Sequence, residues 1–351
     1  MDVADFRSDT VTWPTPAMRE AMATAPIGDD VYGEDPTINE LEALASAKVG
    51  KEAGLFVASG TMGNLAAIFS HAGRGDQAIV GKDAHTFRAE AGGMSALGGV
   101  VPMPLETDFE GRMNLQEIES AIIKDDPHHA QTQLILLENS FAKKNGAPLS
   151  KAYFIDIRQI ADRHGLNVHL DGARLFNATT ALGIEPTELT RHVDSVTFCL
   201  SKGLCAPVGS VLCGSKPFIH QARRARKILG GGMRQAGILA AAGIIALTEM
   251  IERLPEDHAK ARQLADGLSQ ISGIKVDLDS VRTNFVFFDL ADEVMMSTTE
   301  IRNALQQEAN ILIDESGFRQ FRAVTHYWVG MEDVQNLLSV LRYLSSKGWS
   351  S

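Results

Sequence analysis

Residues 194–210 read DSVTFCLSKGLCAPVGS and combine a strand, a lysine and a turn in one segment. The apolar run from Val196 to Leu200 has the length and the β-branched and aromatic content of a buried strand. Ser201 and Lys202 follow this run at once, and glycine and proline residues then predict a turn. A second short apolar run, from Val208 to Cys213, follows the turn. We therefore expect a lysine at the mouth of a buried strand.

Lys202 in this place indicates chemistry rather than packing, because an ammonium group is costly to desolvate. A lysine amine that is neutral part of the time is a nucleophile toward carbonyl groups, and it forms the Schiff base that holds pyridoxal phosphate. The alternative is a surface lysine that merely follows a strand. Residues 194–210 alone leave both interpretations open.

A carboxylate follows another predicted strand upstream. Residues 167–178 read NVHLDGARLFNA, which predicts a strand from Val168 to Leu170 that ends at Asp171 before a helix begins. In α/β folds, groups at the carboxyl ends of buried strands contact ligands. A carboxylate there can pair with a protonated pyridine nitrogen and keep a pyridoxal cofactor an electron sink. Taken in isolation, Asp171 is equally well explained as the N-cap of the following helix.

Two further strand ends contribute to the same predicted site. Residues 56–64 read FVASGTMGN, a strand followed by small residues and a helix, where backbone N–H groups can bind a phosphate. The lack of a GxGxxG pattern favours a single phosphate over a dinucleotide. His85 follows the predicted strand Gln77–Gly81 and precedes a helix predicted from Thr86 to Leu97. Its ring can stack on a planar cofactor or move protons, and the alternative is a hydrogen-bonded structural histidine.

The composition is that of an acidic globular protein. The chain has 351 residues, a formal net charge of −11, 44% apolar residues and 22% charged residues. The negative charge argues against nucleic acid or an anionic membrane as a partner, and no apolar run approaches the roughly 20 residues of a membrane span. The acidic N-terminus does not resemble a signal peptide, and the three cysteines lack metal-ligand spacing. We therefore expect a cytoplasmic protein that binds no metal.

The order of the predicted elements indicates two domains. Strands alternate with helices from Gly54 to Gly214, which favours a mainly parallel sheet wrapped by helices. We place the boundary at residues 254–255, so that residues 1–254 form a large cofactor-binding domain and residues 255–351 form a small α+β domain. The N-terminal segment 1–15 is a candidate to pack near the small domain.

The motifs, taken in order, resemble those of the threonine aldolase family along nearly the whole chain. The matching blocks are RSDTVTWPT, GDDVYGEDPT, SGTMGN, HLDGARLFNA, SKGLCAPVGS, GGGMRQAG and RAVTH. The resemblance implies an α/β fold of the aspartate-aminotransferase-like kind, PLP fold type I, with a mainly parallel seven-stranded sheet in the large domain. It also implies cleavage of a β-hydroxy-α-amino acid, of the L-threonine or L-allo-threonine type, to glycine and an aldehyde.

The resemblance implies roles for residues that would hold pyridoxal 5'-phosphate. Lys202 is expected to form the Schiff base, Asp171 to pair with the pyridine nitrogen, and His85 to stack on the ring. Gly60 and Thr61 are expected to hold the phosphate. The other expected members of the cofactor-binding set are Arg174, Ser201 and Arg234.

The resemblance also implies a substrate site and an oligomer. Ser8, Arg174 and Arg322 match the positions that hold the carboxylate of a small amino-acid substrate. The family is usually a homotetramer, a dimer of dimers, with sites shared between subunits. Tyr32 and Arg234 are the candidates for contacts across a subunit boundary.

Three positions depart from the family pattern. The family commonly has a histidine near the substrate hydroxyl where this chain has Phe141, a tyrosine at the place of Ala89, and a glycine at the place of Cys205. The first two changes predict a roomier and more apolar pocket. One consequence is an aldolase for larger or aryl β-substituents, with water or His85 as the base. The other is racemisation or β-elimination on the same cofactor. The intact cofactor and carboxylate residues favour the aldolase.

Overall fold

The computed structural model describes residues 3–349 and divides into two compact units. The larger unit comprises residues 13–144 and 148–251. The smaller unit comprises residues 145–147, the chain from Glu252 onward, and the N-terminal residues as far as Thr12. Both ends of the described chain therefore belong to the smaller unit.

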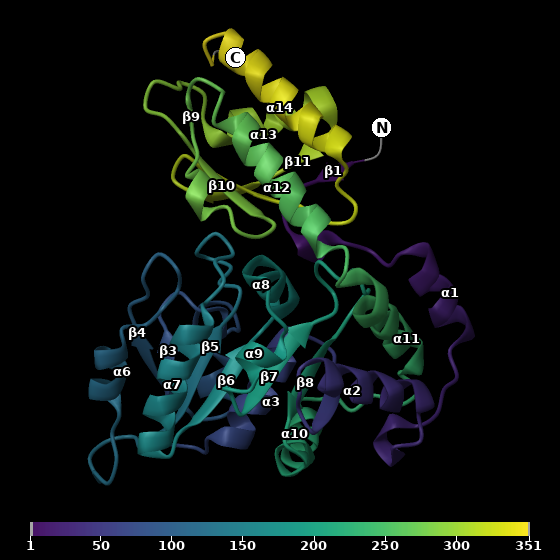
Figure 1. Ribbon diagram of the computed structural model, residues 1–351, viewed down its shortest axis with the longest axis vertical. Helices are drawn as coiled ribbons and strands as arrows, with labels where there is room; N and C mark the ends of the chain where they lie inside the picture. Colours follow the sequence, from purple (N-terminus) through teal and green to yellow (C-terminus); the bar gives the residue numbers. More distant parts are fainter. Residues whose placement is uncertain (1–2, 350–351) are drawn as a thin grey trace. The chain divides into compact units, whose positions relative to one another are not determined.

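The larger unit is built on a seven-stranded sheet of order β2-β8-β7-β6-β5-β3-β4 (Figure 1). Its strands are β2 (Ala53–Val57), β3 (Gln77–Gly81), β4 (Val101–Leu105), β5 (Thr132–Glu138), β6 (Asn167–Asp171), β7 (Ser195–Cys199) and β8 (Ser210–Gly214). β8 is antiparallel to both neighbours, and the other pairs are parallel. The mainly parallel seven-stranded sheet is thus confirmed. Because parallel strands end at the same edge, the residues that follow β3, β5, β6 and β7 meet there.

Helices connect and cover these strands. Those of the larger unit are α1 (Pro16–Thr24), α2 (Pro36–Lys48), α3 (Gly60–His71), α4 (His85–Arg88), α5 (Gly93–Ala96), α6 (Leu115–Ala121), α7 (Lys151–His164), α8 (Leu175–Leu182), α9 (Thr187–Thr190), α10 (Lys216–Ile228) and α11 (Gly237–Ile245), with the short turns η2 (Asp30–Tyr32) and η3 (Ala246–Met250). Helix α7 illustrates how the sequence sets these bounds. The Ser150 side chain accepts the N–H of Tyr153 at its start, and Gly165 ends it with a φ of 60°.

The smaller unit has its own antiparallel sheet, of order β12-β13-β10-β9, and a parallel pair of β1 with β11. Its elements are β1 (Ala4–Asp5), η1 (Asp9–Val11), α12 (Leu254–Leu268), β9 (Ile274–Lys275), η4 (Leu278–Ser280), β10 (Phe285–Leu290), α13 (Thr298–Ala309), β11 (Ile311–Leu312), β12 (Asp314–Gly317), β13 (Gln320–Val324) and α14 (Met331–Ser346). Phe6, from the N-terminal segment, is fully buried in the same apolar cluster as Phe288 and Phe321. Burial of this ring explains why the first residues belong to this unit.

The prediction of a single helix over residues 86–97 is wrong. Two short helices, α4 and α5, replace it, because Ala91 and Gly92 adopt positive φ angles of 53° and 66°. A glycine loses more conformational freedom in a helix than any other residue, so the chain breaks there easily. The break turns Glu90 inward, where it is 4% exposed.

Phe141 fills core space in the larger unit, contrary to the expectation of a roomier pocket at this position. The ring is 2% exposed and belongs to an apolar cluster with Ile68 and Leu134. A Cβ built on Gly111 would lie only 2.3 Å from the Phe141 ring. Ala89, the other position expected to enlarge the pocket, is exposed.

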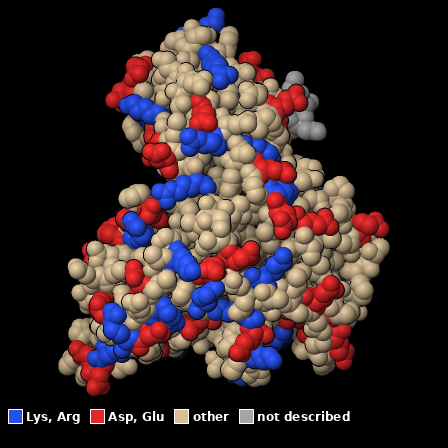
Figure 2. Space-filling model, viewed as in Figure 1, with Lys and Arg blue, Asp and Glu red and all other residues tan. Residues whose placement is uncertain are grey.

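The surface mixes charges of both signs. Lys and Arg side chains are interspersed with Asp and Glu side chains on the face that Figure 2 shows. In the part of the chain between residues 3 and 349, we find no helix with the length and apolar character needed to cross a bilayer.

The position of Phe141 generates a prediction on stability. Replacing it by histidine (Phe141→His) places a polar imidazole in an apolar cluster, so the free energy of unfolding should fall by about 2–4 kcal/mol. Phe141→Leu, which stays apolar, should lose about half as much or less. Urea unfolding of the two variants and the wild type measures the difference. A Phe141→His protein as stable as the wild type, with higher activity on threonine, would show that this side chain faces the pocket.

Candidate active site

The carboxyl ends of the parallel strands place the first residues of the site. Glu138 is the last residue of β5, Asp171 is the last residue of β6, and Lys202 follows β7 in a half-buried position. The charges of Asp171 and Lys202 both act on the His85 imidazole. Ligand atoms of Asp171 and His85 lie within 4.8 Å of each other, and Lys202 lies near enough for its charge to act on His85.

Asp171 is 2% exposed and is hydrogen-bonded at both carboxylate oxygens. Its Oδ2 accepts from Nδ2 of Asn64 at 2.9 Å, and its Oδ1 accepts from the backbone N–H of Ala173 at 3.1 Å. The N-cap position of α8 is held by Arg174 and not by Asp171. This carboxylate is thus free of the capping role and is held toward the site edge by two donors.

Sequence reasoning missed Asn64 and Glu90. One carboxylate oxygen of Glu90 accepts both from Nδ2 of Asn64 at 2.8 Å and from Nδ1 of His85 at 2.9 Å. Burial is the main reason why the pKa of Glu90 is raised. The helix predicted over residues 86–97 hid the contact between His85 and Glu90, because side chains that meet along a helix lie three or four positions apart and not five.

His85 begins α4 and has a half-exposed side chain. Its backbone N–H donates to Oε2 of Glu138 at 2.7 Å. The hydrogen bond from its ring to Glu90 is the largest cause of a raised pKa at His85. Because Nδ1 faces Glu90, Nε2 is the ring nitrogen left for chemistry.

Glu138 ties two loops at the edge of the sheet and was not predicted. Besides the bond from His85, its Oε1 accepts the backbone N–H of Ala142 at 3.0 Å. Burial, with the negative charge of Asp171 as the next cause, raises the pKa of Glu138 to about 7. The carboxyl group therefore orients His85 through its backbone and titrates near neutral pH.

A helix begins at the small residues that the sequence predicts as a phosphate site. Helix α3 begins at Gly60, earlier than expected, so the N–H groups of Gly60 and Thr61 lie in its first turn at the positive end. A Cβ on Gly60 would lie 3.0 Å from Sγ of Cys199, so a larger residue would crowd this wall. The hydroxyl of Ser210, in the same wall, is buried and without a hydrogen-bond partner within the described residues.

The turn after Lys202 is closed by Cys205, whose N–H donates to the carbonyl oxygen of Lys202 at 2.9 Å. Cys205 adopts a φ of 63°, the left-handed region that favours glycine. Cys205 stands where the family commonly has a glycine. At this φ angle a side chain adds about 1 kcal/mol of backbone strain. Ser201, half-buried between β7 and Lys202, lies at the entrance of the same turn.

The expected carboxylate-binding residues are divided between the units. Ser8 and Arg322 lie in the smaller unit, where Nη2 of Arg322 donates to the carbonyl oxygen of Arg7 at 2.9 Å and pairs with Asp314 at 2.7 Å. Ser8 caps η1 by accepting the backbone N–H two residues further on. Arg174 lies in the larger unit, half-buried at the start of α8. Arg322 thus binds the backbone of the residue next to Ser8.

Tyr32 and Arg234 lie together on the surface of the larger unit. The guanidinium of Arg234 stands 5.9 Å from the centre of the Tyr32 ring and 2.9 Å from a carboxylate oxygen of Asp29. Tyr32 is 74% exposed. The two candidates for subunit contacts therefore form one exposed pair.

These groups fit pyridoxal phosphate. The helix start at Gly60 offers backbone donors to a phosphate, and Asp171 offers an anion to a protonated ring nitrogen. Lys202 offers an amine to the aldehyde. A Cβ at position 60 would crowd Sγ of Cys199 at 3.0 Å, so glycine leaves room at the start of α3.

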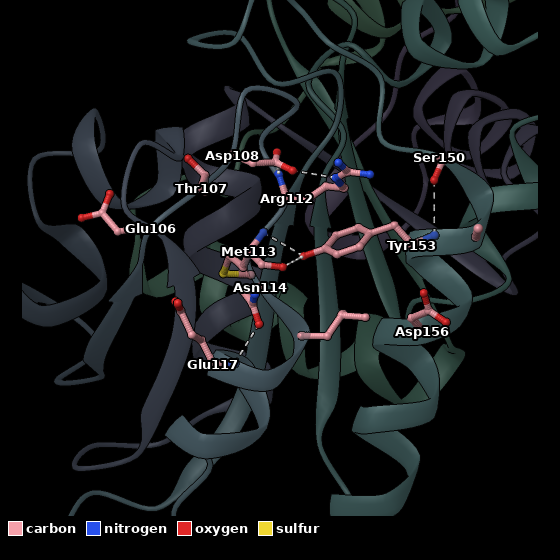
Figure 3. A pocket seen from close by; sticks show the side chains of 12 residues that line it. Glu106, Thr107, Asp108, Arg112, Met113, Asn114, Glu117, Ser150, Tyr153 and Asp156 are labelled. Carbon is pink, nitrogen blue, oxygen red and sulfur yellow. Dashed lines mark hydrogen bonds and ion pairs between the residues drawn. The ribbon is translucent and has the colours of Figure 1, made fainter.

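A separate cavity of about 550 Å³ lies between the loop before α6 and helix α7 (Figure 3). In it, the Tyr153 hydroxyl donates to the carbonyl oxygen of Met113 and accepts its N–H, each at 3.0 Å. The residues that line it include Glu117 and Asp156 but none of the site residues predicted from the sequence.

Comparisons with known proteins agree with one another. The beta-eliminating lyase family matches residues 5–292. The chain is 46% identical over 342 residues to low-specificity L-threonine aldolase 1 of Arabidopsis thaliana, covering 97% of this chain and 95% of the relative. The solved threonine aldolase of Leishmania major has a TM-score of 0.82 at 22% identity, covering 97% of this chain and 99% of that one.

The solved serine palmitoyltransferase of Sphingomonas wittichii shares the fold with a TM-score of 0.75 and 17% identity, over 99% of this chain and 88% of that one. A structure of SPT solved with PLP has a TM-score of 0.74 at the same identity and coverage. At such identities these solved structures establish the fold alone. The expected PLP fold type I is confirmed.

The raised pKa of Glu138 predicts how stability depends on pH. Between its ordinary value of 4.5 and about 7, the unfolded chain is ionised at this carboxyl while the folded chain keeps its proton. Folding therefore loses stability as pH rises through this range, by about 2–3 kcal/mol between pH 5 and pH 8. Urea unfolding of the apoenzyme at both pH values should show that Glu138→Gln lacks this part of the dependence. The same dependence in both proteins would contradict the assignment.

Proposed function

Because the chain belongs to the low-specificity L-threonine aldolases of the beta-eliminating lyase family, we propose that it cleaves β-hydroxy-α-amino acids of the L-threonine or L-allo-threonine type to glycine and an aldehyde. The observation that carries this function is the grouping of Lys202, Asp171 and the His85–Glu90 pair at one sheet edge. The aldolase relatives do not favour racemisation or β-elimination as the reaction.

Pyridoxal phosphate is the cofactor that this site would hold. When bound, it supplies an electron sink for the pair released as a Cα–Cβ bond breaks. Lys202 would hold it covalently, Asp171 would pair with the ring nitrogen, and His85 would lie against the ring. Gly60 and Thr61 would bind the phosphate. The other cofactor contacts would come from Arg174, Ser201 and Arg234.

The substrate carboxylate would be held by Arg174 and Arg322, with Ser8 as a further donor. Charge-assisted bonds from a guanidinium to a carboxylate are strong and fix direction as well as position. With the carboxylate fixed, the substrate can turn its Cα–Cβ bond perpendicular to the cofactor ring, the orientation that cleavage requires. Asp314 forms an ion pair with Nη2 of Arg322 at 2.7 Å and so orients the guanidinium group.

His85 would act as the base for the substrate hydroxyl. Its Nδ1–H donates to Glu90, so the lone pair of Nε2 can accept the β-hydroxyl proton as the aldehyde leaves. The buried carboxylate of Glu90 then faces the imidazolium that results. This role replaces the histidine that the family commonly has at the place of Phe141, whose ring is buried in the core.

We also propose a cytoplasmic homotetramer assembled as a dimer of dimers. The chain carries three cysteines, all of them buried, and so few cysteines are typical of proteins from a reducing compartment. Ile27, Val31 and Tyr32 expose large apolar or aromatic side chains on one loop, beside Arg234. Such a surface suits contact with a second copy of the chain.

The reaction itself can be tested by its products. Incubation of the protein and pyridoxal phosphate with threonine, allo-threonine, phenylserine, serine and alanine should yield glycine plus the matching aldehyde from the three larger β-hydroxy amino acids. Chromatography of amino acids and a coupled aldehyde assay measure the outcome. Pyruvate, ammonia or the opposite enantiomer as the main product would mean a different reaction.

Lys202→Ala is the matched control for this assay. It should lose turnover and the borohydride-fixed chromophore yet keep its fold, because the substitution removes an amine and leaves the apolar core intact. A variant that kept most of its activity would rule out Lys202 as the covalent anchor.

Glu90→Gln tests His85 as the base through the pH profile. His85 must be neutral to accept a proton, so kcat/KM should rise with pH through a midpoint above 6.5 in the wild type. Without the Glu90 carboxylate the main cause of the raised pKa is gone, so the midpoint should move to lower pH while activity falls. Glu117→Gln, in the separate cavity, should leave the profile unchanged. An unshifted midpoint in Glu90→Gln would exclude this base.

A further inference from the structure

A line of buried and half-buried polar side chains runs between α3 and the strands β6 and β7, from the edge that carries Asp171 to the opposite end of the strands. Nε2 of His169 lies 3.1 Å from Oδ1 of Asn64, and its Nδ1 lies 2.8 Å from Oγ of Ser195. That hydroxyl lies 2.7 Å from Nε2 of His71. The proposed reaction does not use His169, Ser195 or His71.

Both histidines of this line are neutral at physiological pH. His169 is fully buried, and burial lowers its pKa to about 3. Burial likewise lowers the pKa of His71 to about 4. A neutral imidazole carries one N–H donor and one acceptor nitrogen, so each ring can take only one role at each nitrogen.

The direction of every hydrogen bond in the line follows from its carboxylate end. Nδ2 of Asn64 donates to both Asp171 and Glu90, so its Oδ1 needs a donor. His169 therefore carries its proton on Nε2, and its Nδ1 accepts from the hydroxyl of Ser195. The same hydroxyl oxygen then accepts the N–H of His71.

The amide of Asn64 has only one workable orientation. The ligand atoms of His85, Glu90 and Asp171 lie within 4.8 Å of one another. With the amide turned over, Oδ1 of Asn64 would face two carboxylates and their shared donor would be lost. Loss of a hydrogen bond to a buried carboxylate lowers the stability of the folded protein by roughly 1–3 kcal/mol or more.

We propose that His169 is a positioning residue for the cofactor site. Its Nε2–H holds the Asn64 amide so that the NH2 group faces Asp171 and Glu90, and this fixes the Asp171 carboxylate for the cofactor ring nitrogen. The proposal rests on the proposed function for the identity of that cofactor. The line is a device of orientation and does not carry protons to the site, because a carboxamide between the imidazole and Asp171 does not relay them.

Two substitutions of His169, by glutamine and by asparagine, distinguish the roles of its two ring nitrogens. The amide nitrogen of glutamine can take the place of Nε2 and keep the bond to Asn64. The shorter asparagine reaches only the place of Nδ1 and leaves Oδ1 of Asn64 without a donor. Titration of each apoenzyme with pyridoxal phosphate, followed by visible absorbance, should give a Kd about tenfold higher for His169→Asn, a loss of about 1.4 kcal/mol. His169→Gln should stay within about threefold of the wild type.

The melting temperatures of the same apoenzymes separate positioning from simple core packing. If His169 only packs, both variants should lose affinity in step with their loss of stability, or neither should lose affinity, and either result overturns the proposal. Ser195→Ala gives a second variant, because Nδ1 of His169 then loses its donor and the ring is free to change tautomer. Its Kd should rise between those of the wild type and His169→Asn, and an unchanged Kd counts against the proposal. No substrate is present, so failure of the aldolase assay would leave these results standing.

Discussion

The site depends on the hydrogen bonds that replace the lost hydration of one buried carboxylate, that of Asp171. Taking an ionised group out of water costs several kcal/mol unless hydrogen bonds replace the lost hydration. Ala173 supplies one bond from the next turn, and Asn64 supplies the other from α3. Helix α3 must therefore pack closely on the sheet, and a Cβ on Gly63 would lie 2.6 Å from Cγ2 of Thr197.

The same packing sets the charge states around the site. Burial raises the pKa of the acids Glu90 and Glu138, so these carboxyl groups keep a proton to higher pH than they would in a solvated chain. Burial lowers the pKa of His169, so this imidazole stays neutral. His85, which is half-exposed, has a raised pKa because of its bond to Glu90. His85 is thus a half-exposed imidazole whose proton affinity is raised by a buried carboxylate.

Short-range patterns predicted the strand-borne part of the site. Strands over Gln77–Gly81 and Phe285–Leu290 have the bounds expected from their apolar runs, since a buried strand needs such a run whatever its neighbours are. Helix bounds depend more on tertiary contacts, and the helix predicted over residues 86–97 is broken in the structure. Glu90 was missed for that reason. Phe141 was misjudged because a residue type does not say whether its side chain faces core or pocket.

The sequence by itself determined the alternation of strands and helices, the lysine and aspartate at strand ends, and the family motifs. These are local features, written in consecutive residues whose spacing fixes which chemistry is available. Only the tertiary structure decided that Asn64, His169 and Ser195 meet beneath α3, although up to 131 positions separate them (195 − 64). The physical reason is that hydrogen bonds between distant segments depend on how a helix docks on a sheet, and no local pattern records that.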